Sequence, residues 1–207
     1  RVHFRPADIS IGPDGAIYIA DWYDPGSGGH ATRDESSSGA IYRIAPKGFK
    51  SVVPSLDLQT IDGQIKALLS PDPNVRFLGF QALQKNGPKA YAAVSELLGH
   101  KNPYLSARAI WLLPHLGEAG IKKVQSLLKS EDSLNRLVAY RSLRRSGQNL
   151  IPHAQVLAKD KNAGVRRDVA LSMRSYSGKQ SNSILLDVSK RYDGVDKNYV
   201  ESIGLGA

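Results

Sequence analysis

The sequence contains no cysteine among its 207 residues. Without a thiol the chain forms no disulfide, no thiolate metal site and no covalent bond to a c-type haem, and it has no cysteine nucleophile. This composition suits an oxidising compartment, where stray thiols are a liability. The sequence also lacks any apolar run approaching the roughly 18 residues that indicate a membrane span, so we expect no transmembrane helix.

The sequence has no excess of acidic residues either, and its formal net charge is +9. Residues 1–50 hold six Lys or Arg and six Asp or Glu, so the whole excess lies in residues 51–207. A basic surface attracts nucleic acid or acidic partners. It also serves simply to solvate the outside of a helical protein, and we favour that interpretation. The sequence has no phosphate-binding loop, dinucleotide-binding glycine pattern, nucleophile elbow or zinc-protease motif.

Short strand patterns occupy the first fifty residues. Period-two alternation of apolar residues predicts two strands, and the positions that carry it are Ile9, Ile11, Ile17 and Ile19. Between them lies Gly-Pro-Asp-Gly, a combination that favours a hairpin turn. A third strand is expected over residues 40–44. Three short antiparallel strands make about one propeller blade or a small sheet, which buries no core of its own.

The connection between the second and third strands covers residues 21–39 and is long for a hairpin. Its candidate binding residues are Asp21, Trp22, Asp24, His30, Arg33 and Asp34, with Glu35 beside them. Carboxylates suit a hard cation such as Ca²⁺, and His30 suits acid–base work. The alternative is a solvated Gly/Ser loop anchored by Trp22 and Tyr23, which we favour because the carboxylates match no metal-loop spacing. The six residues remain the candidates for a binding role if the loop has one, and we predict no catalytic residue and no metal ligand.

A ladder of equivalent residues with a 30-residue step runs through the rest of the chain. Polar helix starts are Asp72, Asn102, Asp132 and Asn162. Small residues that permit a close helix crossing are Gly79, Ala109, Ala139 and Val169. Large apolar residues are Leu83, Leu113, Leu143 and Met173, and left-handed residues that end a helix are Gly87, Gly117 and Gly147. Such a period predicts a solenoid of paired helices.

Each repeat is expected to begin with a side chain that accepts a hydrogen bond from a free N–H of the first helical turn. Pro73 and Pro103 follow directly, where proline costs least. The first helix of each repeat is expected at residues 75–84, 105–116, 134–145 and 165–176. The second is expected at residues 88–98, 119–128, 151–158 and 181–191. A leading helix before Pro71 and a last helix at 197–203 complete the pattern.

The repeat start reads Asp/Asn-x-x-Val/Leu-Arg, with Ser106 in place of arginine in one repeat. Two antiparallel helices per 30 residues with this start resemble HEAT repeats. The resemblance implies that the arginines and the polar helix starts brace neighbouring repeats rather than bind a ligand. The predicted structural positions are Asp72, Arg76, Asn102, Asp132, Arg136, Asn162 and Arg166.

Gly-Pro-Asp-Gly, then Tyr-x-x-Asp-Trp, Gly-Gly-His and a strand at 39–44 resemble the last blade of the membrane-bound dehydrogenases of planctomycete and verrucomicrobial type. That family joins a β-propeller to HEAT repeats and a cytochrome c-like haem domain. The resemblance implies sugar or alcohol oxidation in the periplasm or another extracytoplasmic space, with PQQ or Ca²⁺ and haem c as cofactors of the parent. This chain departs from the pattern by lacking further blades and the Cys-x-x-Cys-His motif, so we expect no cofactor within it.

The remaining candidates are isolated. His100, His115 and His153 are interpreted as surface or capping residues, because none has a metal-ligand partner at helical spacing. Trp111 is predicted to pack in the core. A basic stripe is formed by Arg141, Arg144, Arg145 and Arg174. A HEAT protein that binds DNA would hold phosphates with such a stripe, but no aromatic residues are interleaved with it, and we interpret it as a solvated face.

The predicted fold is mainly α: an α-α superhelix of HEAT-like repeats at 55–207, after a small antiparallel β segment at 1–54 that resembles a propeller blade. Because the chain begins with Arg1 rather than Met, we expect a fragment of a longer protein. Its predicted function is a scaffold or protein-interaction module, whose partners are other domains of the parent or another protein. Two alternatives stay open: a contribution of loop 21–39 to a dehydrogenase site, and the less favoured binding of nucleic acid.

Overall fold

The computed structural model describes residues 4–22 and 39–207 and contains a three-stranded sheet and a series of helices. The predicted fold class, mainly α with a small antiparallel sheet, is confirmed. The chain divides into two compact units after Leu83, inside one helix. Within the described ranges, none of the helices is long and apolar enough to cross a membrane.

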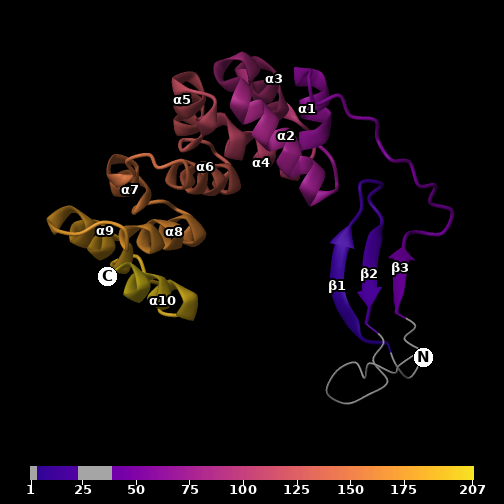
Figure 1. Ribbon diagram of the computed structural model, residues 1–207. Coiled ribbons are helices and arrows are strands. Elements are labelled where there is room, and N and C mark those ends of the chain that lie inside the picture. The colour runs from indigo at the N-terminus through magenta and orange to yellow at the C-terminus, as the bar shows by residue number, and fades with distance from the viewer. Residues whose placement is uncertain (1–3, 23–38) are drawn as a thin grey trace. The chain divides into compact units, whose positions relative to one another are not determined.

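The sheet consists of β1 (Pro6–Ile11), β2 (Ile17–Asp21) and β3 (Ala40–Ile44) in the order β1-β2-β3, with both pairs antiparallel (Figure 1). Gly15 has φ +83°, a left-handed conformation that glycine adopts without strain, and it closes the predicted hairpin turn. The strands therefore lie where the alternation of isoleucines predicts them.

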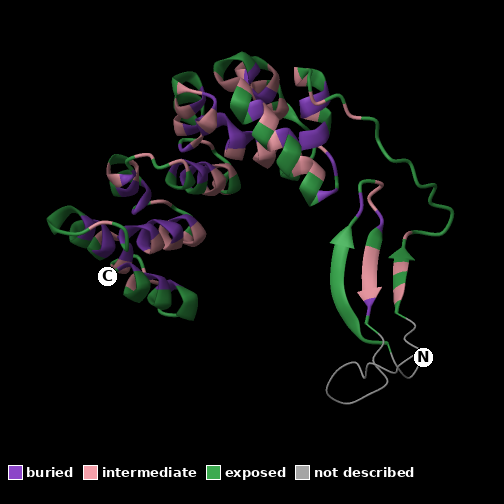
Figure 2. Ribbon diagram, viewed as in Figure 1, coloured by how far each residue is buried: buried purple, intermediate pink, exposed green. Residues whose placement is uncertain are grey.

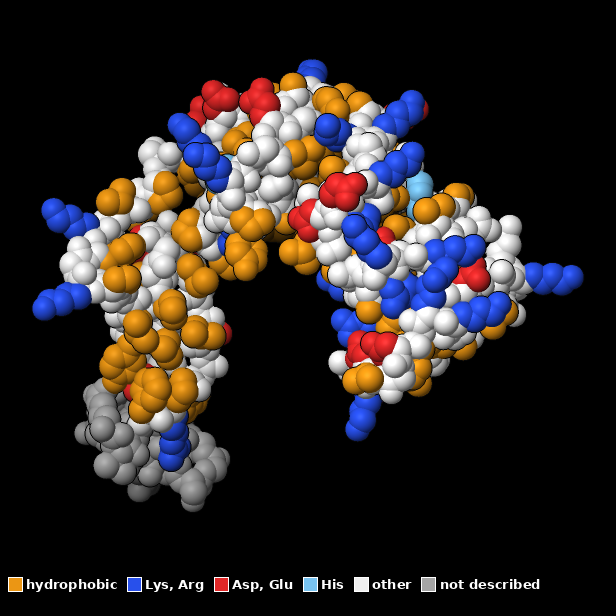
Figure 3. Space-filling model, turned by 180° about the vertical axis from the view of Figure 1, so that it is seen from behind, with side chains coloured by type: hydrophobic (Ala, Val, Ile, Leu, Met, Phe, Trp, Pro, Cys, Tyr) orange, Lys and Arg blue, Asp and Glu red, His pale blue; other side chains and the backbone are white. Residues whose placement is uncertain are grey.

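One face of the sheet is apolar and uncovered. Residues directly opposite each other in an antiparallel pair share a face. The register thus collects six side chains on one surface: Ile9, Ile19, Tyr42, Ile11, Ile17 and Ile44. Ile9 is 66% exposed and Ile44 is 51% exposed. β1 is exposed along its whole length (Figure 2), and Figure 3 shows hydrophobic side chains crowded on the sheet. As expected for three strands, this sheet has almost no core of its own.

The helices of residues 84–207 form two layers (Figure 1). The first-helix layer contains α4 (Pro103–Leu112), α6 (Ser133–Arg145), α8 (Ala163–Met173) and α10 (Lys197–Gly206). The second-helix layer contains α3 (Tyr91–Glu96), α5 (Glu118–Leu127), α7 (Ile151–Leu157) and α9 (Lys179–Ser189). Earlier in the chain, α1 (Ile61–Leu68) packs on the first part of α2 (Pro73–Asn86).

The core follows the residue ladder. The large residues Leu83, Leu113, Leu143 and Met173 are fully buried, and so are Ala109, Ala139 and Val169 of the small set. At Gly79 the backbone of α1 lies so close that an added Cβ would be 2.5 Å from the Leu68 nitrogen. A methyl group has no room at that distance, so this close crossing of α1 and α2 requires glycine.

Polar side chains cap the first helices. The carboxylate or amide oxygens of four residues accept the backbone N–H two positions further on, at 2.7–2.9 Å: Asp72, Asn102, Asp132 and Asn162. Asp196 caps α10 in the same way at 3.0 Å. Each of these bonds satisfies a backbone donor that the helix itself leaves free.

The glycines after the first helices act in different ways. Gly147 has φ +75° and ends α6 with its own N–H on the Arg144 carbonyl and the Gln148 N–H on the Leu143 carbonyl. Gly117 was predicted to be a left-handed helix end, and this prediction is wrong. Its φ is +98° but its ψ is −173°, and it occupies the N-cap position of α5. An extended ψ is needed there because the chain turns directly into the next helix.

Two predicted helices are partly 3₁₀. The segment predicted as one helix at 88–98 consists of a 3₁₀ turn at Gly87–Ala90, α3, and a second 3₁₀ turn at Leu97–Gly99. The helix predicted at 105–116 ends as α-helix at Leu112 and continues as a 3₁₀ turn. The reason in the second case is Pro114, which has no N–H to donate to the Ile110 carbonyl four residues earlier.

Buried hydrogen bonds between side chains and neighbouring helices connect consecutive repeats. The Ile110 carbonyl that Pro114 leaves free accepts the Ser142 hydroxyl from α6 at 2.7 Å. One repeat further on, the Tyr140 and Ser172 hydroxyls lie 2.6 Å apart. Burial raises the pKa of Tyr140 well above its ordinary value, so this phenol stays protonated. The first-helix layer is therefore held together by polar bonds as well as by apolar packing.

Candidate functional site

The three repeat arginines hold the turns before their own helices. In each case Nη1 donates to the carbonyl groups of the two residues that precede the cap. The shortest of these bonds are 2.6 Å for Arg76, 2.8 Å for Arg136 and 2.7 Å for Arg166. Ser106 stands at the equivalent position of the second repeat, and its hydroxyl donates to the Leu98 carbonyl at 3.0 Å. The short side chain thus reaches the end of the preceding helix.

Arg136 also joins two repeats. Its Nε and Nη2 both donate to the Asp160 carboxylate at 2.7 Å, and only 7% of the Arg136 side chain and 5% of the Asp160 side chain are exposed. Arg166 has a different partner in the next repeat. Its Nε donates to the Tyr199 hydroxyl at 2.8 Å, and the guanidinium lies 5.3 Å from the centre of that ring. Both arginines are occupied by the protein itself, which leaves no free guanidinium for a ligand at these positions.

The lowered pKa of Asp160 makes the stability of the fold depend on pH. Burial alone would raise the pKa of Asp160, but hydrogen bonds from the Arg136 guanidinium and the Asn162 N–H outweigh burial and hold that pKa below its usual range. A carboxyl group with a lowered folded-state pKa contributes stability that is present above its unfolded pKa. The contribution is lost as the pH falls through the folded pKa.

We therefore expect the stability difference between the wild type and Asp160→Asn to be greatest at neutral pH. It should shrink progressively once the pH falls below about 4, the ordinary pKa of an aspartate, because protonated Asp160 then resembles asparagine. Urea unfolding followed by circular dichroism at a series of pH values measures this difference. A gap of constant size between pH 7 and the acid limit would contradict the assignment.

Of the predicted loop residues, Asp21 and Trp22 lie within the described part of the chain, whereas Asp24, His30, Arg33 and Asp34 lie outside it. Asp21 is 7% exposed, and its carboxylate accepts the Arg5 N–H at 2.8 Å and the Tyr42 hydroxyl at 3.4 Å. Trp22 is 53% exposed. Over residues 4–22 and 39–207, no group of three or more His, Asp or Glu side chains could hold a metal ion. The binding role of the loop stays a prediction.

Sequence reasoning missed Asp14 of the hairpin turn. Its carboxylate accepts the Ser51 hydroxyl at 2.6 Å, the Arg43 Nη2 at 2.8 Å and the Ala16 N–H at 3.0 Å. These bonds, led by that of Ser51, lower the pKa of Asp14 well below its usual range. Asp14 therefore fastens the turn to β3 and to the segment that follows it. Its carboxylate thus serves to hold this part of the fold together.

The basic stripe, by contrast, lines a hollow surface, which we call the arginine groove. Its residues are Trp111, Arg141, Arg144, Arg145, Leu171, Arg174 and Ser175. Two adjoining hollows of about 290 and 200 Å³ make up the groove, and both are lined by Arg144 and Ser175. Figure 3 shows Lys and Arg side chains crowded over the C-terminal helices. The groove crosses α4, α6 and the end of α8, so three consecutive repeats contribute to it.

The arginines of the groove are not equivalent. Arg141 donates to both oxygens of Asp168, at 2.9 and 2.6 Å, and this pair neutralises its charge. Arg144, Arg145 and Arg174 are exposed and have no hydrogen bond or ion pair with any residue that the structure describes. The groove therefore presents three guanidinium groups whose donors are free.

Trp111 was predicted to pack in the core, but its side chain is only partly buried. The side chain is half-buried and lines the groove beside Arg141 and Arg145. It occupies the same position in its repeat as Arg141 and Leu171 do in theirs, and all three line the same pair of hollows. This position therefore faces the groove in all three repeats. The apolar neighbours of Trp111 in the sequence suggested a core position instead.

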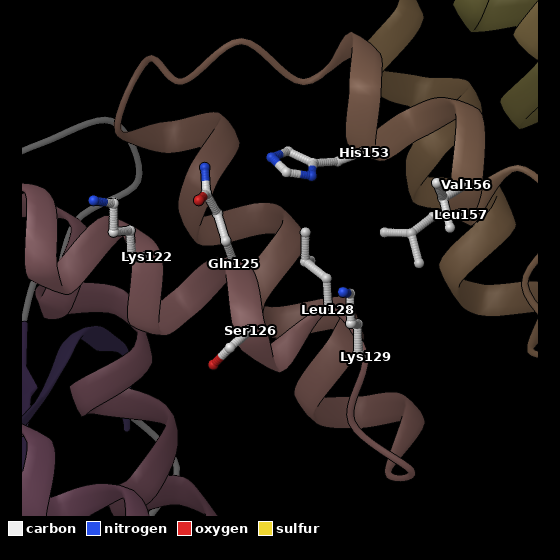
Figure 4. Close-up of a pocket in the computed structure, with 8 residues that line it drawn as sticks. All are labelled: Lys122, Gln125, Ser126, Leu128, Lys129, His153, Val156 and Leu157. Carbon is white, nitrogen blue, oxygen red and sulfur yellow. The ribbon is translucent and has the colours of Figure 1, made fainter.

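Another hollow, of about 380 Å³ and separate from the arginine groove, lies in the second-helix layer between α5 and α7 (Figure 4). The His153 ring extends from α7 toward α5, and the apolar lining comes mainly from Leu128, Val156 and Leu157. Partial burial lowers the pKa of His153, so the ring is neutral at pH 7. The Ser126 hydroxyl donates to the Lys123 carbonyl at 2.7 Å rather than to His153. The hollow thus contains no nucleophile activated by a base.

The layered, capped and cross-braced helices define a helical-repeat protein of the solenoid type. Residues 91–174, from α3 to the end of α8, match the family of HEAT repeats. This match includes the Arg136–Asp160 pair and every residue of the arginine groove except Ser175. No curated protein matches the chain.

Proposed function

We propose that this chain is a scaffold that binds another protein or another domain through its HEAT repeats. The observation that carries the proposal is the contrast between two kinds of polar residue in the first-helix layer. One kind forms hydrogen bonds and ion pairs that brace the repeats, as Arg136, Asp160 and Arg166 do. Arg144 and Arg174 are held on that braced surface with free donors. A rigid surface with unsatisfied charge suits recognition, because little order is lost when a partner binds.

We also propose the context that the sequence resemblance implies, a larger extracytoplasmic dehydrogenase. Its PQQ or Ca²⁺ and its haem c would be bound by other parts of the parent. The support comes from the blade-like motif of residues 4–44 and from the uncovered apolar face of the sheet, which in a propeller would pack on neighbouring blades. The complete reading frame tests this context. Further blade motifs before Arg1 and a Cys-x-x-Cys-His downstream would support it, and a frame without them would exclude it.

Site-specific photo-cross-linking tests the interaction function. A benzoyl-phenylalanine replaces Arg145 in the groove or, separately, Val156 in the other layer, in the full-length protein within its own cells. We expect cross-links from position 145 to one repeatedly identified protein or domain, because the free charges lie there. The identified partner, once purified, should bind the chain saturably in calorimetry. Cross-links from neither position, or a cross-linked protein that shows no binding once purified, would show that the repeats are not an interaction module.

A further inference from the structure

We propose that the arginine groove binds an acidic peptide segment in which carboxylates flank a bulky apolar side chain. This inference rests on the proposed interaction function and gives the chemistry of the partner. It starts from the three free guanidinium groups of Arg144, Arg145 and Arg174. A planar guanidinium binds a carboxylate through two parallel hydrogen bonds, which makes it specific as well as strong.

The spacing of the charges suits a ligand that crosses the helices. Arg144 and Arg174 occupy the same position in consecutive repeats, on α6 and directly after α8. Arg145 lines the larger of the two hollows, together with Arg144 and with Trp111 of α4. An extended segment laid across α4, α6 and α8 would therefore meet guanidinium groups in both adjoining hollows. The Tyr140–Ser172 bond and the Arg141–Asp168 pair tie α6 to α8 and keep these positions in register.

The apolar part of the lining explains why a peptide with a bulky side chain fits. Trp111 lines the larger hollow and Leu171 the smaller one, and both side chains are half-buried. Each hollow thus combines an apolar wall with a free arginine. A carboxylate alone would leave the apolar wall in contact with water, whereas a large apolar side chain would cover it. Interface anchors are typically of this kind, a buried apolar or aromatic group beside a charged one.

Nucleic acid fits the groove less well, because the free charges are confined to two repeats. The residues of the preceding repeat that are equivalent to Arg144 and Arg145 are Pro114 and His115. Burial lowers the pKa of His115, so it adds no charge at neutral pH. Binding to a phosphate backbone requires a track of several cationic contacts, and single strands need successive aromatic platforms. Trp111 is the single aromatic side chain that lines the two hollows.

The experiment uses the whole chain and a short fluorescent peptide in which a central phenylalanine is flanked on both sides by aspartates. Fluorescence anisotropy at low salt should give saturable binding that weakens as salt is added. The same peptide with asparagines in place of the aspartates should not bind. Arg144→Gln/Arg174→Gln should reduce the affinity by about tenfold or more, since each lost bidentate contact to a charge is a strong one.

Lys122→Gln/Lys129→Gln is the matched control, because it removes the same charge from the rim of the other hollow. It should change the affinity less than about twofold, since those lysines lie in the opposite layer. Circular dichroism melts must agree with the wild type for both double variants. No binding of the aspartate peptide at low salt, or an equal loss in both double variants, would overturn the proposal. Tighter binding of an oligonucleotide of equal charge would overturn it in favour of nucleic acid.

The outcome is separable from that of the proposed function. A partner that is cross-linked only from position 156, combined with no peptide binding, would preserve the interaction function and reject the arginine groove as its site. Peptide binding lost in Arg144→Gln/Arg174→Gln, with no cross-linked partner, would preserve the groove chemistry and reject a protein partner in the cell.

Discussion

Gly120→Ala is expected to destabilise the helical repeats by about 2 to 3 kcal/mol, although alanine is the better helix former by about 1 kcal/mol. Gly120 is buried in α5, where the helix crosses the 3₁₀ turn that follows α4. A Cβ at this position would overlap the Leu113 carbonyl oxygen and lie 2.7 Å from the Leu113 carbonyl carbon. These are backbone atoms held by their own hydrogen bond to the Leu116 N–H, so they cannot yield as a side chain would.

Gly204→Ala is the matched control for this substitution. Gly204 lies in α10 and is exposed, and a Cβ there would meet no described atom within 4 Å. The same substitution should therefore leave the midpoint of urea unfolding unchanged or raise it slightly. If Gly120→Ala proves as stable as Gly204→Ala, the close approach of α5 to the turn after α4 does not exist in solution.

The contrast between Gly120 and Gly79 shows what the sequence could reveal. Gly79 belongs to a set of small residues repeated every 30 positions, and its close helix crossing was predicted from that period. Gly120 does not belong to such a set: Ala90, 30 positions earlier, is also small, but the residues 30 and 60 positions later are Leu150 and Gln180. Its approach to Leu113 depends on the 3₁₀ turn that Pro114 imposes. A local irregularity of this kind leaves no periodic signal.

Contacts between residues far apart in the sequence could not be predicted, for a related reason. The caps and the large core residues could be predicted because a helix fixes their neighbours within a few positions. Asp14, in contrast, meets Ser51 only after the chain has formed three strands and returned. The four arginines of the stripe were found in the sequence, but only the structure separates Arg141, neutralised by Asp168, from the three that are free. Whether an arginine pairs with a carboxylate of the next repeat depends on the distance between the two side chains in the folded protein. The sequence alone does not give that distance.

Removal of the buried guanidinium in Arg136→Met is expected to have the second large effect, a loss of about 3 kcal/mol in the free energy of unfolding. Methionine keeps the apolar stem of the side chain but leaves the Asp160 carboxylate buried without its bidentate partner. It also removes the donors to the Ser130 and Glu131 carbonyls before the helix. Desolvation of an unpaired charge is costly, so the greater part of the loss is the penalty on Asp160 rather than the worth of the pair.

A double-mutant cycle separates these two contributions. Because asparagine is uncharged, Arg136→Met/Asp160→Asn should be clearly more stable than the sum of the two single changes predicts, with a coupling of about 1 kcal/mol or more. Glu118→Gln serves as the control, since Glu118 and Lys122 form an exposed pair within α5 at 2.6 Å. Pairs of that kind contribute little, and no measurable loss is expected from it. Additive losses at Arg136 and Asp160 would mean that the two side chains act independently, and that the repeats are held together by apolar packing and by the Ser142 and Tyr140 hydroxyls instead.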